Sequence, residues 1–303
     1  MVAAGIDIGS NTVLMVVAEV DRYGKINVFH EAHEIPRLAQ GLGENGGITV
    51  EAVQRATSVL AEYRSIISQF GNPRVTAVAT AALRSASNRE KVRKTLEHVL
   101  GAPIHVLSGQ QEAMLTFAGT TAGVFGPATV LDIGGGSTEI VHGMDGRASW
   151  AQSLPIGCVY LTEQYQDAHP LQAQNRDSIC YAIDDAITSC HVPFRVSSGS
   201  FLAVAGTATT IAMLNAGISS YDTTVLIGYQ LTIDRAEFWA NSLLSMDLNT
   251  LQELPGVDIR RSDVLPVGAL ILHRVMQNLG AQSVQISVKG LRYGALLNAF
   301  GLV

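Results

Sequence analysis

The spacing of apolar and polar residues along the chain predicts alternating strands and helices. In the first half, alternating or short continuous apolar runs predict strands at 2–8, 12–20, 25–33, 74–79 and 104–107. Apolar residues at helical spacing predict helices at 49–70, 87–100 and 109–123, and a glycine-containing loop is expected at 37–43. The resulting order, β-β-β-α-β-α-β-α, is typical of α/β proteins.

The second half of the chain begins with the same pattern. Strands are predicted at 128–131, 138–142, 148–154, 201–205 and 283–287, and helices at 158–165, 171–192, 207–215, 234–245 and 262–279, before a last helix. A length of 303 residues fits two domains of ordinary size. We therefore expect duplicated domains at 1–123 and 124–303, and we keep open that the last helix packs back on the first domain.

Two serine-containing segments predict helix starts. Ser87-Asn-Arg-Glu90 and Ser108-Gly-Gln-Gln111 both have the spacing of a capping box, in which the serine and the residue three positions later bond each other's backbone. Both segments should therefore open a helix.

Composition and charge restrict the class of protein. The chain is 47% hydrophobic and 15% charged, which fits a well-cored soluble protein, and its formal net charge of −6 argues against broad nucleic-acid binding. No apolar run approaches the roughly 20 residues of a membrane helix, and no secretory signal is expected. Cys158, Cys180 and Cys190 lack metal-type spacing and are expected to be reduced thiols of a cytoplasmic protein.

Two basic clusters are expected to lie on the surface. Arg89, Lys91, Arg93 and Lys94 form a run with the composition of a solvated helix face, and Arg260-Arg261 form a second cluster. Either cluster could also guide a long polyanion.

One short phrase occurs twice and is the strongest candidate for chemistry. Asp7-Ile-Gly-Ser-Asn-Thr12 and Asp132-Ile-Gly-Gly-Gly-Ser-Thr138 each lie between two predicted strands. Glycine lets backbone N–H groups approach an anion, and Ser, Thr and Asn add short donors, so both turns suit phosphate. An aspartate repels phosphate, so its expected task is to hold a divalent cation.

Three further segments could join these turns, and each also has a purely structural interpretation. Arg84 follows a predicted strand and could bind phosphate or form a surface ion pair. Glu112 could be functional or could favour the helix dipole, with Gln111 beside it as a capping residue. Gly206–Thr210 could bind an anion at a helix start or be a capped tight turn.

Taken together, these motifs and their order resemble those of the exopolyphosphatase / guanosine pentaphosphate phosphohydrolase (Ppx/GppA) family. The likeness extends over essentially the whole chain. It rests on Asp7–Thr12, Thr80–Arg84, Ser108–Ala113, Asp132–Glu139, Gly206-Thr207, Leu265–Gly268 and Gly290–Gly294. The duplicated element order likewise resembles the actin-like ATPase (ribonuclease H-like) fold, which implies two such domains with an interdomain cleft.

The resemblance implies hydrolysis of a terminal phosphoanhydride, with Mg²⁺ or Mn²⁺ as cofactor and polyphosphate or the pentaphosphate pppGpp as substrate. It implies that Glu112 activates the attacking water, with Asp132 and Arg84 as further catalytic residues. It also implies metal ligation by Asp7, Asp132 and Glu139. The implied phosphate-binding residues are Ser10, Asn11, Gly134, Gly135, Gly136, Ser137, Gly206 and Thr207. No nucleic-acid or membrane partner is expected, and a homodimer is kept open.

The chain departs from the family pattern at two positions and leaves several functions open. Gln111 replaces an acidic residue, and Arg292-Tyr293-Gly294 replaces Arg-Glu-Gly, which bears on metal affinity, rate and substrate choice. The His-Asp module of longer relatives is expected to be absent. Exopolyphosphatase activity is the leading hypothesis. The alternatives are a pppGpp 5'-phosphohydrolase, a non-catalytic sensor of (p)ppGpp or polyphosphate, and an ATP-dependent kinase.

Overall fold

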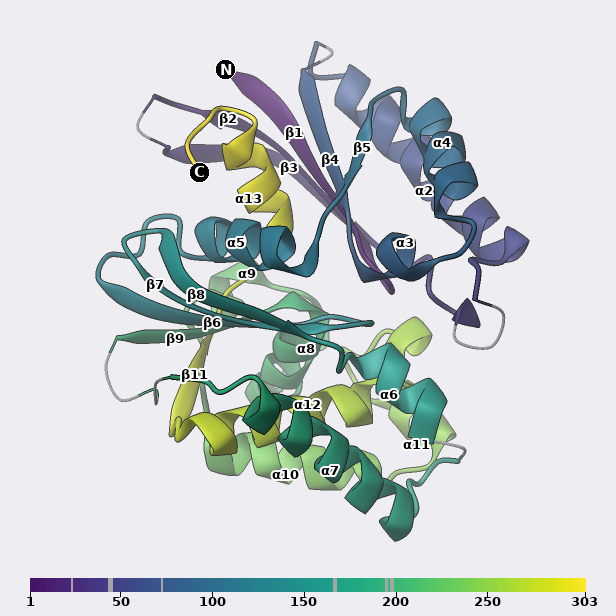
Figure 1. The fold of residues 1–303 in the computed structure, drawn as a ribbon, viewed down its shortest axis with the longest axis vertical. Helices are drawn as coiled ribbons and strands as arrows, with labels where there is room; N and C mark the ends of the chain where they lie inside the picture. Colours follow the sequence, from purple (N-terminus) through teal and green to yellow (C-terminus); the bar gives the residue numbers. More distant parts are fainter. Residues whose placement is uncertain (23, 43–45, 72, 166–167, 194–195, 197–198) are drawn as a thin grey trace. The chain divides into compact units, whose positions relative to one another are not determined.

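The computed structural model describes every residue except 23, 43–45, 72, 166–167, 194–195 and 197–198 (Figure 1). Its contacts divide the chain into two units. The first unit contains residues 1–125, 145–151 and 289–303, and the second contains 126–144 and 152–288. The last helix, which the domain prediction placed in 124–303, thus belongs to the first unit. Gly43, the end of the expected loop at 37–43, lies outside the described residues.

The first unit is built on a five-stranded mixed sheet with the order β3-β2-β1-β4-β5. The central strand β1 is antiparallel to β2 and parallel to β4. The strands are β1 (Val2–Ile8), β2 (Val13–Val20), β3 (Ile26–Glu34), β4 (Arg74–Ala79) and β5 (Ile104–Val106). The helices of this unit are α2 (Val50–Ser68), α3 (Ala81–Ser85), α4 (Arg89–Leu100), α5 (Gly109–Thr120) and α13 (Leu291–Asn298).

Both faces of this sheet are buried, which explains why β1 and β2 are almost entirely apolar. Alternate side chains of a strand point to opposite faces. Ala4, Ile6 and Ile8 pack into the core that α2 and α4 cover. Ala3 packs into a second core with Tyr293 and Leu296 of α13. A sheet that is covered on both sides needs continuous apolar strands, and the sequence pattern has them.

The second unit repeats this plan around a six-stranded sheet with the order β10-β11-β9-β6-β7-β8. Its strand β6 is antiparallel to β7 and parallel to β9, as β1 is to β2 and β4. The strands are β6 (Pro127–Ile133), β7 (Thr138–Met144), β8 (Arg147–Leu154), β9 (Ser200–Val204), β10 (Gln230–Thr232) and β11 (Ser283–Ile286). The helices are α6 (Cys158–Tyr165), α7 (Ala173–Ser189), α8 (Ala205–Ala216), α9 (Thr223–Leu226), α10 (Ile233–Leu244), α11 (Leu248–Glu253) and α12 (Leu265–Leu279).

The predicted α/β class and duplicated element order are confirmed, and the differences lie in short elements. The sequence analysis missed α3, β10, α9, α11 and a 3₁₀ turn at Ile259–Arg261. Each of these is six residues or shorter, so few positions were available to show a period. The predicted helix at 262–279 begins only at Leu265, after that turn and with a proline in its first turn.

One of the two predicted capping boxes forms. The Ser108 hydroxyl accepts from the Gln111 N–H at 3.2 Å, and the Gln111 side-chain oxygen accepts from the Ser108 N–H at 2.9 Å. The box predicted at Ser87 is wrong, because α4 begins one residue later with Asn88 as its N-cap. The Asn88 amide instead bonds both the N–H and the carbonyl of Ile48, so it ties the start of α4 to the segment before α2.

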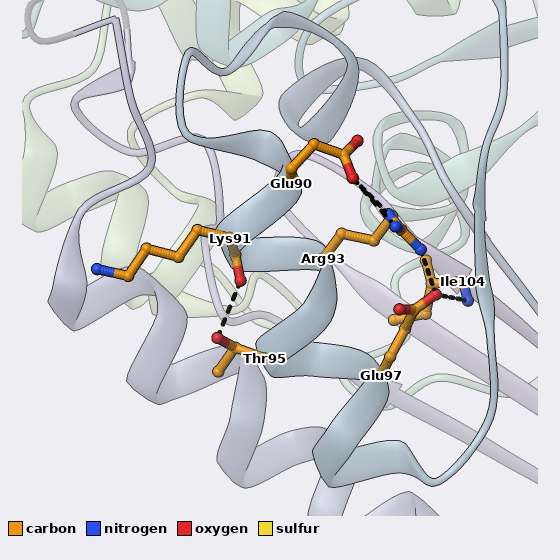
Figure 2. Close-up of polar contacts among 6 residues, drawn as sticks. All are labelled: Glu90, Lys91, Arg93, Thr95, Glu97 and Ile104. Carbon is orange, nitrogen blue, oxygen red and sulfur yellow. Dashed lines mark hydrogen bonds and ion pairs between the residues drawn. The ribbon is translucent and has the colours of Figure 1, made fainter.

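The predicted solvated basic face lies on α4. Arg89, Lys91 and Lys94 are exposed, as expected, whereas Arg93 is half-buried. Figure 2 shows Arg93 between two glutamates of the same helix: it donates to Glu90 at 3.0 Å and to Glu97 at 2.6 Å. Because Glu97 also accepts from the Ile104 N–H at 2.8 Å, this network links α4 to β5.

Ser87 and Ser108, of which only Ser108 caps a helix, form a matched pair for a stability test. Replacing Ser108 by alanine removes an N-cap acceptor and should lower the free energy of unfolding by about 1 kcal/mol. Replacing Ser87 should change it by less than about 0.5 kcal/mol, because no cap is lost there. Urea denaturation of both variants measures this, and equal losses would show that the Ser108 cap is not a stabilising element.

Candidate active site

The turn between β1 and β2 closes tightly in the first unit. The Gly9 N–H donates to the Thr12 carbonyl at 2.9 Å, which forms the turn. The carbonyls of Ser10 and Asn11 accept from the N–H groups of Ala39 at 2.8 Å and Arg37 at 3.0 Å. Ser10 and Asn11 are both buried, and the Asn11 side-chain oxygen has no hydrogen-bond partner among the described residues.

The turn between β6 and β7 has the same construction in the second unit. The Gly134 N–H donates to the Ser137 carbonyl at 2.9 Å. The carbonyls of Gly134 and Gly135 accept from N–H groups at the start of α6, Cys158 at 3.0 Å and Val159 at 2.9 Å. A Cβ atom on Gly157 would lie 2.3 Å from the Gly135 carbonyl oxygen, so only glycine fits at 157.

The engaged carbonyls determine where the amides of these turns point. In a trans peptide the C=O and the following N–H point in opposite directions. The N–H groups of Asn11 and Thr12 in the first turn, and of Gly135 and Gly136 in the second, therefore point away from the segments that hold the carbonyls. Adjacent N–H groups that point the same way form an anion-binding nest. Each unit thus has a turn that suits a phosphate.

The acidic residues differ between the two turns. Asp132 lies directly opposite Glu139 in the register of β6 and β7, whereas the residue opposite Asp7 is Leu14. Side chains at directly opposed positions lie on the same face, and like charges there repel each other. Glu139 is buried and accepts a hydrogen bond from Ser153 at 2.5 Å. This pair is therefore the better candidate for a cation site.

The described residues contain no cluster of three His, Cys, Asp or Glu side chains that could hold an ion. Of the three residues expected as metal ligands, Asp7 belongs to the first unit, and Asp132 and Glu139 belong to the second. Two carboxylates still fit Mg²⁺, which is usually bound by one or two carboxylates together with substrate phosphates and water.

Glu112 and Arg84 are brought together in the first unit. The capping box places Glu112 in the first turn of α5, where its side chain is buried. Its Oε2 accepts from Arg84 Nη1 at 2.8 Å, and the same nitrogen donates to the Leu107 carbonyl at 3.0 Å. Arg84 lies at the end of the short helix α3 after β4 and is half-buried. It is thus bound to a functional candidate rather than to a surface partner.

Burial raises the pKa of Glu112 above its ordinary value of 4.5, and the hydrogen bond and charge of Arg84 oppose that rise. A carboxylate with a raised pKa is a stronger base, and Glu112 is ionised above that pKa. Gln111, by contrast, uses its side chain in the capping box, which confirms its expected structural role.

The start of α8 has a cationic residue that sequence analysis placed on the surface. That prediction is wrong for Arg261, which is only 7% exposed, although Arg260 is bound to Asp258 as a surface residue would be. A Cβ atom on Gly206 would lie 1.7 Å from Arg261 Nη1, so the guanidinium lies directly against this glycine. No side chain caps α8. Gly206 and Thr207 therefore adjoin a buried positive charge.

The charge of Arg261 is only partly compensated, since Asp258 favours it electrostatically but also pairs with Arg260. Its Nε has no hydrogen-bond partner in the described part of the chain. Burial raises the pKa of the neighbouring Cys158 thiol, so that thiol is neutral at pH 7 and does not offset the charge. A buried cation is costly unless an anion binds it. The sequence signal for a functional Arg261 was its position just before the motif Leu265–Gly268. Gly268 of that motif packs against Thr207.

The remaining predictions concern membrane-spanning helices and cysteines. Helices of the described chain lack the length and apolar character that crossing a membrane requires. All three cysteines are free thiols, as expected.

These features define an α/β protein with duplicated units, each of which has a turn that suits a phosphate, and comparison with known proteins is consistent with them. The model of the Ppx/GppA phosphatase family matches residues 16–301, so the chain belongs to this family. It is a hydrolase of phosphoanhydride bonds with the actin-like ATPase fold, as the motifs indicated.

Solved structures resemble the chain over nearly its full length. An exopolyphosphatase-like protein is 29% identical, with 98% of this chain and 97% of that chain covered and a TM-score of 0.93. The Aquifex aeolicus family member is 27% identical, with 99% and 97% covered and a TM-score of 0.83. An exopolyphosphatase from Cytophaga hutchinsonii, 21% identical with 100% and 99% covered, shows the same fold with a TM-score of 0.89.

Replacing Arg261 by methionine should separate stability from ligand binding. Loss of the buried cation should raise the melting temperature of the ligand-free protein by a few degrees, because the free-energy cost of burying the guanidinium disappears. The additional stabilisation by tripolyphosphate should fall sharply. Thermal unfolding with and without tripolyphosphate tests this, with Arg260→Met as the exposed control. Undiminished stabilisation in Arg261→Met would contradict a ligand-binding role.

Proposed function

We propose that this chain is a divalent-metal-dependent exopolyphosphatase in which Glu112 activates the attacking water. The observation that supports this most is a buried carboxylate with a raised pKa, bound by a single arginine, at the start of α5. Such a group suits proton abstraction from water near neutral pH. The 29% identity to an exopolyphosphatase-like protein supports polyphosphate as the substrate class.

In this proposal each turn binds phosphate groups of the substrate. The amides of Asn11, Thr12, Gly135 and Gly136 would donate to phosphate oxygens, with Ser10 and Ser137 as additional donors. Arg261 would neutralise part of the charge beside Gly206. Phosphoryl transfer depends mainly on positioning and charge neutralisation, and these groups supply both.

A divalent ion would be held by Asp132 and Glu139 together with substrate phosphates, and Asp7 would be the candidate ligand in the turn of the first unit. When bound, such an ion neutralises charge on the phosphoryl oxygens. The opposed carboxylates favour it because their mutual repulsion is then relieved.

Glu112 would accept a proton from the water as it attacks the terminal phosphorus. Arg84 would hold the carboxylate in place and keep it ionised, because its positive charge opposes the effect of burial on the pKa. The bond from the terminal phosphorus to the bridging oxygen breaks, and the shortened chain leaves with that oxygen. The free thiols support a reducing, cytoplasmic setting for this reaction.

Replacing Glu112 by glutamine removes the base but retains its size. Phosphate release from polyphosphate should fall by about 10²–10⁴-fold, the usual contribution of a general base. The exposed Glu90 of α4 offers the control, since Glu90→Gln should leave turnover within twofold. Equal rates in wild type and Glu112→Gln would exclude Glu112 as the base. Parallel assays with pppGpp establish which substrate the wild type prefers.

The pH dependence tests the Arg84–Glu112 contact. Activity should decline as pH falls through the pKa of Glu112, above the range of an ordinary carboxyl group. Replacing Arg84 by glutamine removes an influence that lowers this pKa, so the acidic limb of kcat/KM should move to higher pH. Arg84→Lys retains the charge and should move it less. A limb that stays in place in Arg84→Gln would show that Glu112 does not set it.

A further inference from the structure

The C-terminal helix α13 touches the backbone of α5, the helix that contains Glu112; the two helices lie side by side in Figure 1. A Cβ atom on Gly119 of α5 would lie 2.2 Å from the Gly290 carbonyl oxygen. A Cβ atom on Gly294 of α13 would lie 1.9 Å from the Leu115 carbonyl oxygen. No side chain fits at either position. The two glycines therefore let the backbones of α5 and α13 touch, whereas side chains keep the axes of ordinary helix pairs about 8–10 Å apart.

This contact lies one turn from the candidate base. Leu115 is three positions after Glu112, so the two residues are neighbours on one face of α5. The chain just after α5 is also held, because Lys289 Nζ donates to the Ala122 carbonyl at 2.9 Å. The segment 289–303 therefore contacts α5 at its middle and at its C-terminal end, so we expect a shift or rotation of α13 to displace Glu112 relative to Arg84.

Two buried side chains of α13 determine how that helix is rotated. Arg292 Nη2 donates to Glu31 Oε1 at 2.6 Å, and the Tyr293 hydroxyl donates to the same oxygen at 2.9 Å. Arg292 and Tyr293 are 8% and 3% exposed, and the guanidinium lies 5.1 Å from the centre of the tyrosine ring. Glu31 belongs to β3, so this carboxylate oxygen adds a polar link between the sheet and α13 to the apolar packing of Leu296 and Leu297.

The tyrosine also accounts for a departure from the family pattern. The motif that this chain resembles has Arg-Glu-Gly where the chain has Arg292-Tyr293-Gly294. A glutamate at 293 would place a second negative charge beside Glu31, whereas tyrosine donates a hydrogen bond to it. Tyr293 and Glu31 thus form a matched pair in this chain.

We propose that Glu31, Arg292 and Tyr293 are positioning residues for Glu112. They determine the rotation of α13, α13 determines the position of α5 through Gly294 and Gly119, and α5 sets the distance from Glu112 to Arg84. None of the three residues needs to touch the substrate. The inference rests on the proposed function, in which Glu112 activates water.

The test replaces Glu31 by alanine and, separately, Tyr293 by phenylalanine in the full-length protein. In Glu31→Ala, kcat for polyphosphate should fall about tenfold with KM within twofold, because a small misplacement of a catalytic group slows chemistry. The acidic limb of kcat should also move to higher pH, because a more distant Arg84 lowers the pKa of Glu112 less. Tyr293→Phe should shift both quantities in the same direction by a smaller amount.

Two controls distinguish positioning from general destabilisation. Glu31→Gln retains a side-chain oxygen as acceptor and should recover most of kcat and the wild-type limb. Asn298→Ala lies on the exposed side of α13 and should change neither. All rates are measured well below each melting temperature. Should Glu31→Ala fail to fold, Tyr293→Phe alone tests the positioning role, since it removes a single hydroxyl and leaves the ring in place.

The inference is overturned if kcat falls only in proportion to unfolded protein while the acidic limb stays in place, or if KM rises at constant kcat. Failure of the proposed function itself has a different pattern: wild type and Glu112→Gln would then release phosphate equally. Normal dependence on Glu112 with an unmoved acidic limb in both Glu31→Ala and Tyr293→Phe would reject the positioning role alone.

Discussion

The constraint on which the candidate site depends is the engagement of turn carbonyls by a following segment. In each unit, two consecutive carbonyls of a strand–turn–strand element accept hydrogen bonds from other backbone N–H groups. Peptide planarity then fixes two amides on the opposite side. This arrangement needs little from side chains, so a turn with Ser-Asn and a turn with Gly-Gly can both form it. The engaged carbonyls lie one position earlier in the second turn, at Gly134 and Gly135, than in the first, at Ser10 and Asn11.

Around this shared backbone, the two units have diverged in their charged groups. The first unit has a buried carboxylate and an arginine in direct contact, and the second has opposed carboxylates and a buried arginine beside α8. The pKa of Glu112 reflects two opposing effects, since burial raises it and Arg84 lowers it. A base that acts near neutral pH requires such a balance, because full burial alone would leave it protonated and full exposure would make it weak.

Much of this could be predicted from the sequence, because strand and helix periods, the repeated Asp-Ile-Gly phrase and the Ser108 capping box are all local patterns. Arg261 was predicted wrongly, since a pair of arginines with polar neighbours is usually exposed, and only tertiary packing brings it against Gly206. The contact of Gly294 with Leu115 could not be foreseen either. It joins residues far apart in sequence, and a lone glycine in a helix does not indicate which backbone lies beside it.

The most direct test of the account is an amide NMR titration of deuterated Glu112→Gln protein with tripolyphosphate, where hydrolysis is slow. The account predicts that the amide resonances of Asn11, Thr12, Gly135 and Gly136 shift together as the ligand saturates. If calorimetry shows that tripolyphosphate binds while these four resonances stay in place, the turns are not the phosphate sites and the account is wrong.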